Sequence, residues 1–250
     1  MKIVIIGGTG FIGSKVADNL RQLGHTVIAA APSTGINTIT GEGLAEALQE
    51  TEVVVDISNS PSLEDSVAID FFTNSSRNLL AAEKTAGVKH HLVLSIVGAD
   101  LIDMGYMRAK KAQEDLTKES GVPYTVIRST QFYEFVPVIT GAAKQENEIH
   151  VSDISFQPIA AEDVAKLIST LSLAGPANGT VEIAGPERHT MSDFVGFFVK
   201  ETGGSETVVT NHNSEYFGVR IPTYALVPQG DLKVGHIKFK EWISHQQIKS

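Results

Sequence analysis

Ser95, Tyr106 and Lys110 are residue types that can move a proton together, and they lie close to one another in the chain. Tyr106 and Lys110 have the spacing i, i+4, which puts two side chains on the same face of a helix. A nearby ammonium group lowers the pKa of a tyrosine from its ordinary value of about 10. The pattern predicts that Tyr106 exchanges a proton with a substrate hydroxyl or carbonyl group and that Ser95 orients the substrate oxygen. The alternative is that Tyr106 only packs at a helix start and that Lys110 is exposed to solvent.

Helices and strands alternate around these residues. Ser95 ends an apolar strand at 91–95, and Tyr106 begins a helix at 106–119. The remaining predicted strands are 2–6, 26–30, 36–40, 52–58, 123–128 and 180–185, and the remaining helices are 11–23, 43–50, 64–86, 161–173 and 191–200. This alternation predicts an α/β fold with a doubly wound parallel sheet, in which ligands bind at the carboxyl edge of the strands. Both Ser95 and Tyr106 are expected at that edge.

The stretch GGTGFIG, residues 7–13, joins the first strand directly to the first helix. Gly8, Gly10 and Gly13 satisfy the pattern G-x-G-x-x-G, which allows a tight turn and brings bare backbone close to a pyrophosphate. The amino terminus of the helix then presents free N–H groups to the phosphates. The motif predicts a bound dinucleotide and, with it, a contact between Lys110 and the nicotinamide ribose. The predicted cofactor-binding residues in this loop are Gly7, Thr9, Gly10, Phe11, Ile12 and Gly13.

The end of the second strand favours NADP(H) over NAD(H). No Asp or Glu lies between Asp18 and Glu42, although NAD-binding proteins usually place an acidic residue there to bind the ribose. No arginine follows until Arg77, so the candidates for contact with a 2′-phosphate are Lys15, Ser33 and Thr34. The alternative for Lys15 is an ordinary solvated position.

Composition excludes several other functions. The net charge of −9 disfavours binding to nucleic acid, and the absence of cysteine excludes disulfides, thiolate metal sites and cysteine nucleophiles. The histidines show no metal-ligand spacing, so no metal is expected. No apolar run approaches the length of about 18 residues that a membrane span needs. We therefore expect a cytoplasmic protein that does not bind membranes and acts on a small molecule.

These motifs resemble the short-chain dehydrogenase/reductase superfamily, in its atypical and extended branch, and most closely the NmrA-like NAD(P)-binding proteins. The resemblance rests on the glycine loop, on GYMRAKKAQEDL with its Tyr-x-x-x-Lys, and on SGVPYTVIRSTQFYEF, AAEDVA and TVEIAGPERHTMSDF. It covers essentially the whole chain. It implies one domain over 1–250, with a Rossmann-like core of about 1–135 plus 152–173 and a substrate cap of about 136–151 and 174–250.

The resemblance also implies roles for individual residues. It gives pyrophosphate binding to the glycine loop, catalysis to Ser95, Tyr106 and Lys110, and contact with the adenosine ribose to Asn59. Gln131 and Phe132 would line the substrate pocket, although the aromatic residues around them could equally be packing between sheet and cap. The distance in sequence from Ser95 to Tyr106 is short for the superfamily, and Thr40 replaces its usual aspartate beside adenine. Two functions fit: an NAD(P)-dependent oxidoreductase or epimerase, or a redox sensor that signals through a protein partner. The sequence indicates neither the substrate nor the oligomeric state.

Overall fold

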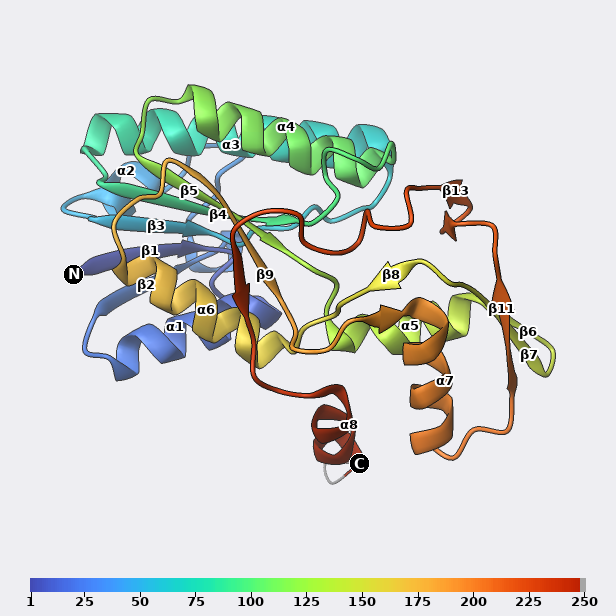
Figure 1. The fold of residues 1–250 in the computed structure, drawn as a ribbon. Helices are drawn as coiled ribbons and strands as arrows, with labels where there is room; N and C mark the ends of the chain where they lie inside the picture. The colour runs from blue at the N-terminus through green and yellow to red at the C-terminus, as the bar shows by residue number, and fades with distance from the viewer. Residues whose placement is uncertain (248–250) are drawn as a thin grey trace.

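A seven-stranded parallel sheet forms the centre of the molecule (Figure 1). The structure is a computed structural model, and it describes residues 1–247. The strands lie in the order β2-β1-β3-β4-β5-β9-β14, and each neighbouring pair is parallel. Their bounds are β1 Lys2–Ile6, β2 Thr26–Ala30, β3 Val53–Asp56, β4 His90–Ile96, β5 Tyr124–Ser129, β9 Gly179–Ala184 and β14 Leu232–Val234. The strand order reverses beside β1, so the predicted doubly wound sheet is confirmed.

Helices cover both faces of this sheet (Figure 1). On one face lie α1 (Phe11–Gln22) and α6 (Ala161–Leu173), and on the other lie α2 (Leu44–Leu48), α3 (Asp65–Ala86) and α4 (Gly105–Glu119). Side chains alternate between the faces of a strand, so Ile3 and Ile5 pack toward α1 and α6 while Val4 and Ile6 pack toward α2 and α3. The same alternation decides which residues of β3, β4 and β5 face α4.

The prediction of a strand at 36–40 is wrong. The segment forms turns between Gly35 and Gly41, whose φ angles are +79° and +81°. Asn78 of α3 donates a hydrogen bond to the carbonyl oxygen of Thr38 at 2.9 Å, so this backbone is held by a helix and not by a strand. As a result, β2 forms one edge of the sheet.

The cap lies beyond the carboxyl ends of the strands (Figure 1). Its elements are η2 Tyr133–Phe135, α5 Val136–Ala142, β6 Lys144–Gln145, β7 Glu148–Ser152, β8 Ser155–Phe156, β10 His189–Thr190, α7 Met191–Glu201, β11 Thr207–Asn211, β12 Glu215–Tyr216, β13 Val219–Arg220 and α8 Phe239–Gln247. The segment 174–250, assigned to the cap from the sequence, also supplies β9 and β14 to the central sheet, so it is shared between sheet and cap. Stacked and edge-on aromatic rings, among them Tyr133, Phe194, Phe239 and Trp242, form much of the cap core.

Two carboxylates fix the path of the carboxy-terminal segment by binding its backbone. Asp163, buried in the first turn of α6, accepts hydrogen bonds from the N–H groups of His236 and Ile237, each at 2.7 Å. Glu182 of β9 accepts one from the N–H of Gln229 at 2.6 Å. These bonds tie the stretch on either side of β14 to earlier elements of the core.

A buried ion pair lies between α3 and β4 on the α4 side of the sheet. The Nδ1 atom of His91 lies 2.8 Å from Oε1 of Glu83, and both side chains are buried. Burial alone lowers the pKa of His91, but the nearby carboxylate of Glu83 outweighs it, and the net shift is upward. The pKa of Glu83 is raised as well, in this case because burial disfavours the charged carboxylate. The pair therefore holds its shared proton to a higher pH than a histidine in the unfolded chain, whose pKa is about 6.5.

This pair predicts that the protein becomes less stable as the pH rises above about 6.5. Above that pH the folded state binds more protons than the unfolded state, so the free energy of unfolding falls by at most about 1.4 kcal/mol per pH unit. His90, whose pKa burial lowers to about 4, contributes an opposite slope until the unfolded histidine has lost its proton, but this contribution is the same when Glu83 and His91 are replaced, so comparison with that double variant cancels it. Urea unfolding between pH 6.5 and 8 measures the slope. The window stops at pH 8 because burial lowers the pKa of Lys110 to about 8, and loss of that proton contributes the opposite slope at higher pH.

The control is a double variant, Glu83→Gln with His91→Gln. Its free energy of unfolding should depend less on pH than that of the unaltered protein, and an unchanged slope would contradict the assignment.

Candidate functional site

The glycine loop between β1 and α1 is packed too closely for side chains. A Cβ atom on Gly13 would lie 2.1 Å from the carbonyl oxygen of Gly7, and one on Gly8 would lie 2.7 Å from the Cα of Ala29. Gly7 itself has φ +76°, a left-handed conformation that favours glycine. Gly10 differs from the others, because a Cβ there would meet only the Gly7 carbonyl oxygen, at 3.2 Å. The loop therefore leaves open space above Gly10, where a pyrophosphate could approach the backbone.

The amino terminus of α1 is arranged to bind an anion. No side chain caps the helix and its first turn contains no acidic residue. The first N–H groups of a helix lack partners within it, so those of Phe11, Ile12 and Gly13 face outward beside the positive end of the helix dipole. The Ile12 side chain is buried in the core, whereas Thr9 and Phe11 are exposed. A dinucleotide phosphate fits this turn, and Ile12 would contribute only its backbone.

The end of β2 offers few groups to a 2′-phosphate. Lys15 forms an ion pair with Glu162 at 3.1 Å. The hydroxyl of Thr34 accepts a hydrogen bond from the N–H of Ala31 at 2.9 Å, within the short helix η1 Pro32–Thr34. Ser33 is exposed on the same turn and makes no side-chain hydrogen bond within residues 1–247. Of the three predicted candidates, Ser33 is thus the one whose side chain is open to a ligand.

Tyr106 lies at the carboxyl edge of the sheet, as predicted. Its hydroxyl donates a hydrogen bond to Oδ1 of Asn59, in the loop after β3, at 2.9 Å. Burial raises the pKa of Tyr106 to about 12. Gly105 fixes the start of α4 against the carboxylate of Asp65, since a Cβ at that position would overlap the carboxylate. The ring of Phe72 packs edge-on against Tyr106, with 5.9 Å between centroids.

Lys110 is buried over the ring of Phe72. Its Nζ atom lies 4.3 Å from the centroid of that ring and donates a hydrogen bond to Oε1 of Gln113. Gln113 in turn donates to Oδ2 of Asp56, at the end of β3, at 2.9 Å. Burial lowers the pKa of Lys110 to about 8, and the negative charges of Asp56 and Glu114 partly offset this. The i, i+4 spacing does place Tyr106 and Lys110 on one side of α4, but the ammonium group bonds to Gln113 and not to the phenol.

Ser95 belongs to a different group of polar residues. It faces α4 from β4, and its hydroxyl donates a hydrogen bond to Oε1 of Glu114 at 2.7 Å. Arg128 holds both oxygens of the same carboxylate at 2.8 Å and also binds Asp100. The structure therefore does not bring Ser95 to the Tyr106 hydroxyl. A strand side chain in this position points into the helix layer. There the Ser95 hydroxyl bonds to Glu114, which is paired with Arg128.

Gln131 and Phe132 follow β5 at the carboxyl edge, where the predicted substrate loop begins. Their backbone is fixed, because the carbonyl oxygen of Gln131 accepts from the N–H of Ile159 at 2.9 Å and Tyr133 donates to Ile159 at 2.9 Å. Phe132 packs against the core on the α1 and α6 side, which favours a packing role for its ring. Within the part of the chain that the structure describes, the Gln131 side chain has no hydrogen-bond partner and remains a candidate for substrate contact.

Sequence reasoning missed Phe72, Asp56 and Gln113, and it gave Asn59 a ribose contact but not the Tyr106 hydrogen bond. Asn59 and Tyr106 are far apart in sequence, so only the tertiary fold brings them together. The spacing i, i+3 from Lys110 to Gln113 could have indicated their contact. Among the side chains that the structure describes, no group of three His, Asp or Glu could hold a metal ion, and no described helix is long and apolar enough to cross a membrane.

Comparison with known proteins identifies the family of this chain. A model of the NAD(P)H-binding family matches residues 7–172. Quinone oxidoreductase 2 of Escherichia coli is 24% identical over 225 residues, covering 82% of this chain and 76% of the relative. The photosystem II assembly factor Ycf39 of Synechocystis sp. is 24% identical over 149 residues, and the match spans 54% of this chain and 46% of that protein.

A solved structure has the same fold across nearly the full chain. The NADPH-dependent quinone oxidoreductase of E. coli superposes with a TM-score of 0.69 at 20% identity and covers 98% of this chain and 99% of its own. At that identity the likeness shows the fold alone. The family match extends over more than half of the chain and includes the glycine loop, β2 to β5 and Tyr106. The chain therefore belongs to the NAD(P)H-binding family, and its Rossmann-like fold is similar to that of solved reductases and epimerases.

Proposed function

We propose that this protein is an NADP(H)-dependent reductase that acts on a carbonyl or quinone group of a small molecule, with Tyr106 as the proton donor. The observation that carries the proposal is the Tyr106 hydroxyl, which lies at the carboxyl edge of the sheet and donates to Asn59. Its pKa of about 12 keeps the phenol protonated at neutral pH. Reduction of a carbonyl or quinone consumes a proton, and a protonated phenol can supply it.

The nicotinamide, when bound, supplies the hydride. The chain binds the pyrophosphate through the N–H groups at the start of α1 and orients the Tyr106 hydroxyl through Asn59. Lys110, one helical turn along α4, would hold a ribose hydroxyl after its ammonium group leaves Gln113. Ser95 has no part in this proposal, since Glu114 occupies its hydroxyl.

Two observations support NADP(H) and a quinone-type substrate. The turn after β2 carries the exposed Ser33 and no acidic residue that would repel a 2′-phosphate. Two similar proteins, both at about a quarter identity, are quinone oxidoreductase 2 of E. coli and the NAD(P)H azoreductase of Xenophilus azovorans. Both names describe reductases.

The second candidate is a redox sensor without turnover. The observation in its favour is that the Lys110 ammonium group donates to Gln113 while the Tyr106 hydroxyl donates to Asn59, so the two groups are not paired. A sensor needs the nucleotide site but does not need that pairing.

Titration of the protein with NADPH, NADP+, NADH and NAD+ tests the proposal, followed by an NADPH-oxidation assay with a panel of quinones and small carbonyl compounds. We expect NADPH to bind about tenfold or more tightly than NADH, a difference of about 1.4 kcal/mol. We also expect turnover with at least one quinone. Strong discrimination between NADP+ and NADPH without turnover would favour the sensor, and failure to bind any of the four nucleotides would contradict both functions.

A further inference from the structure

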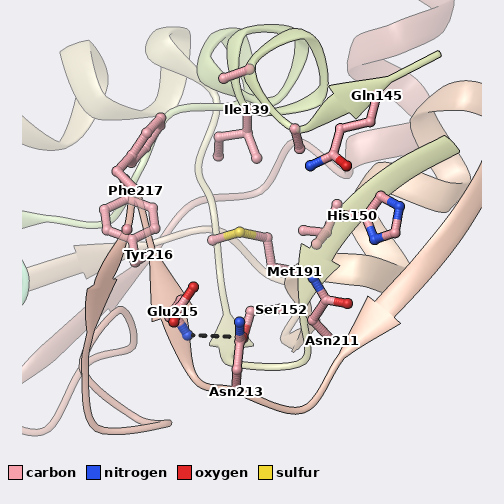
Figure 2. A pocket seen from close by; sticks show the side chains of 14 residues that line it. Ile139, Gln145, His150, Ser152, Met191, Asn211, Asn213, Glu215, Tyr216 and Phe217 are labelled. Carbon is pink, nitrogen blue, oxygen red and sulfur yellow. Dashed lines mark hydrogen bonds between the residues drawn. The ribbon is translucent and has the colours of Figure 1, made fainter.

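The cap contains a cavity of about 270 Å³ that the nucleotide site does not use (Figure 2). It is lined by α5, β7, the start of α7, the end of β11 and the β12–β13 hairpin. No residue of the glycine loop lines it, and neither do Tyr106, Lys110 and Gln131. Its volume is near the lower end of the range for small-molecule sites, about 300 Å³.

A hydroxyl group in the wall of this cavity lacks a partner. Ser152, at the end of β7, is 5% exposed, and its Oγ atom makes no hydrogen bond to any group that the structure describes. Buried hydroxyls in folded proteins are nearly always hydrogen-bonded, so an unpartnered one that lines a cavity indicates a place for a ligand group. Figure 2 shows Ser152 beside Asn213, whose Oδ1 already accepts from the N–H of Glu215 at 3.3 Å. The neighbouring amide is thus partly occupied. The Ser152 hydroxyl has no partner but is itself covered, so it can bond to a ligand group only after its side chain rotates toward the cavity.

One end of the cavity is aromatic and its backbone is strained. Phe217 has φ +48°, a left-handed conformation that is rare for a bulky side chain and recurs at functional sites. Phe217 is 47% exposed, and its ring lies edge-on to the ring of Tyr216, with 4.7 Å between centroids. Figure 2 shows both rings together across from Ile139. A planar ring of a ligand could pack against this surface.

The charges of the lining select against anions. No lysine or arginine lines the cavity, while Glu215 contributes a carboxylate that makes no ion pair among the described residues. His150 is already bonded to Glu148, with 2.9 Å between Nε2 and Oε2. A phosphate or carboxylate group would enter this site without a partner of opposite charge, which is unfavourable.

We propose that the cap cavity binds an uncharged small molecule that has an aromatic ring and a hydroxyl or carbonyl group. The ring packs between Phe217, Tyr216 and Ile139, and the polar group bonds to Ser152. The proposal concerns binding alone and does not depend on turnover at Tyr106.

Calorimetric titration of the full-length protein with 2-naphthol and with 2-naphthoate tests this site. The two probes share a ring system and differ in charge, so we expect 2-naphthol to bind about tenfold or more tightly, because the carboxylate would be buried without a partner. Ala142→Trp, at the exposed end of α5, should fill the cavity and abolish binding of 2-naphthol. Ser152→Ala should weaken it about fivefold by removing one hydrogen bond.

The matched control is Val138→Trp, which adds the same side chain to an exposed position of α5 outside the cavity. It should bind 2-naphthol like the unaltered protein, and the thermal unfolding midpoints of both tryptophan variants should match. The proposal is overturned if 2-naphthol does not bind at millimolar concentration, if 2-naphthoate binds equally well, or if Ala142→Trp leaves the affinity unchanged.

Discussion

Replacing Tyr106 with phenylalanine is expected to lower kcat by about 10²- to 10⁴-fold, the range that a positioned proton donor contributes. The substitution removes only the hydroxyl, so the ring keeps its edge-on contact with Phe72. The dissociation constant for NADPH should stay within about twofold, since the glycine loop and α1 are untouched. Steady-state NADPH oxidation and a nucleotide titration measure the two quantities separately.

Tyr224→Phe is the control for this prediction. Tyr224 is 47% exposed, and no hydrogen bond from its hydroxyl occurs in the described part of the chain. Removing the Tyr224 hydroxyl should leave kcat unchanged. If Tyr106→Phe turns over substrate at the rate of the unaltered protein, Tyr106 is not the proton donor and the proposed mechanism is wrong.

Gly10→Val is expected to raise the dissociation constant for NADPH by about 100-fold or more, which is about 2.8 kcal/mol of binding free energy. A Cβ at Gly10 meets only one protein atom, the Gly7 carbonyl oxygen at 3.2 Å, so the loop should keep its shape. The valine side chain would instead occupy the space where a pyrophosphate approaches the backbone. Fluorescence titration with NADPH measures the loss, and the thermal midpoint should change little.

Gly13→Val separates loss of binding from loss of structure. Its Cβ would lie 2.1 Å from the Gly7 carbonyl oxygen, so this variant should lose both nucleotide binding and thermal stability. Gly196→Ala, inside α7 with nothing within 4 Å of the added atom, should bind NADPH normally and be stabilised by about 1 kcal/mol. Normal NADPH binding by Gly10→Val would show that the nucleotide does not approach this turn.

Patterns in contiguous sequence predicted those features of the fold that depend only on residues close together in the chain. The glycine loop and the strand–helix alternation are written in contiguous sequence, and the family match confirms the nucleotide-binding fold. The spacing of Tyr106 and Lys110 also placed both residues on one helix correctly. The direction of each side chain depends on partners distant in sequence: Asn59 for Tyr106, and Asp56 through Gln113 for Lys110.

Ser95 and the segment 36–40 illustrate the same limit. The position of Ser95 at a strand end predicted an edge residue, but only the packing of α4 reveals that Glu114 and Arg128 surround its hydroxyl. The segment 36–40 has the β-branched composition of a strand, yet Asn78 of α3 holds its backbone in turns. In each case a polar contact from another element decided the outcome, and such contacts leave no pattern in nearby sequence.

The carboxylate bonds around β14 have a consequence for how the chain is made. β5 gains its outer neighbour β9 only after residue 184 has been synthesised, and β9 gains β14 only after residue 234. Until then Asp163 and Glu182 lack the backbone N–H groups that they bind in the folded protein. Domains generally fold as units during synthesis, and strand pairing over such long sequence separations is slow. We therefore expect a ribosome-bound nascent chain that ends before residue 229 to remain sensitive to proteases. Protease resistance should begin only when residues up to 237 have left the ribosome and can bind Asp163 and Glu182.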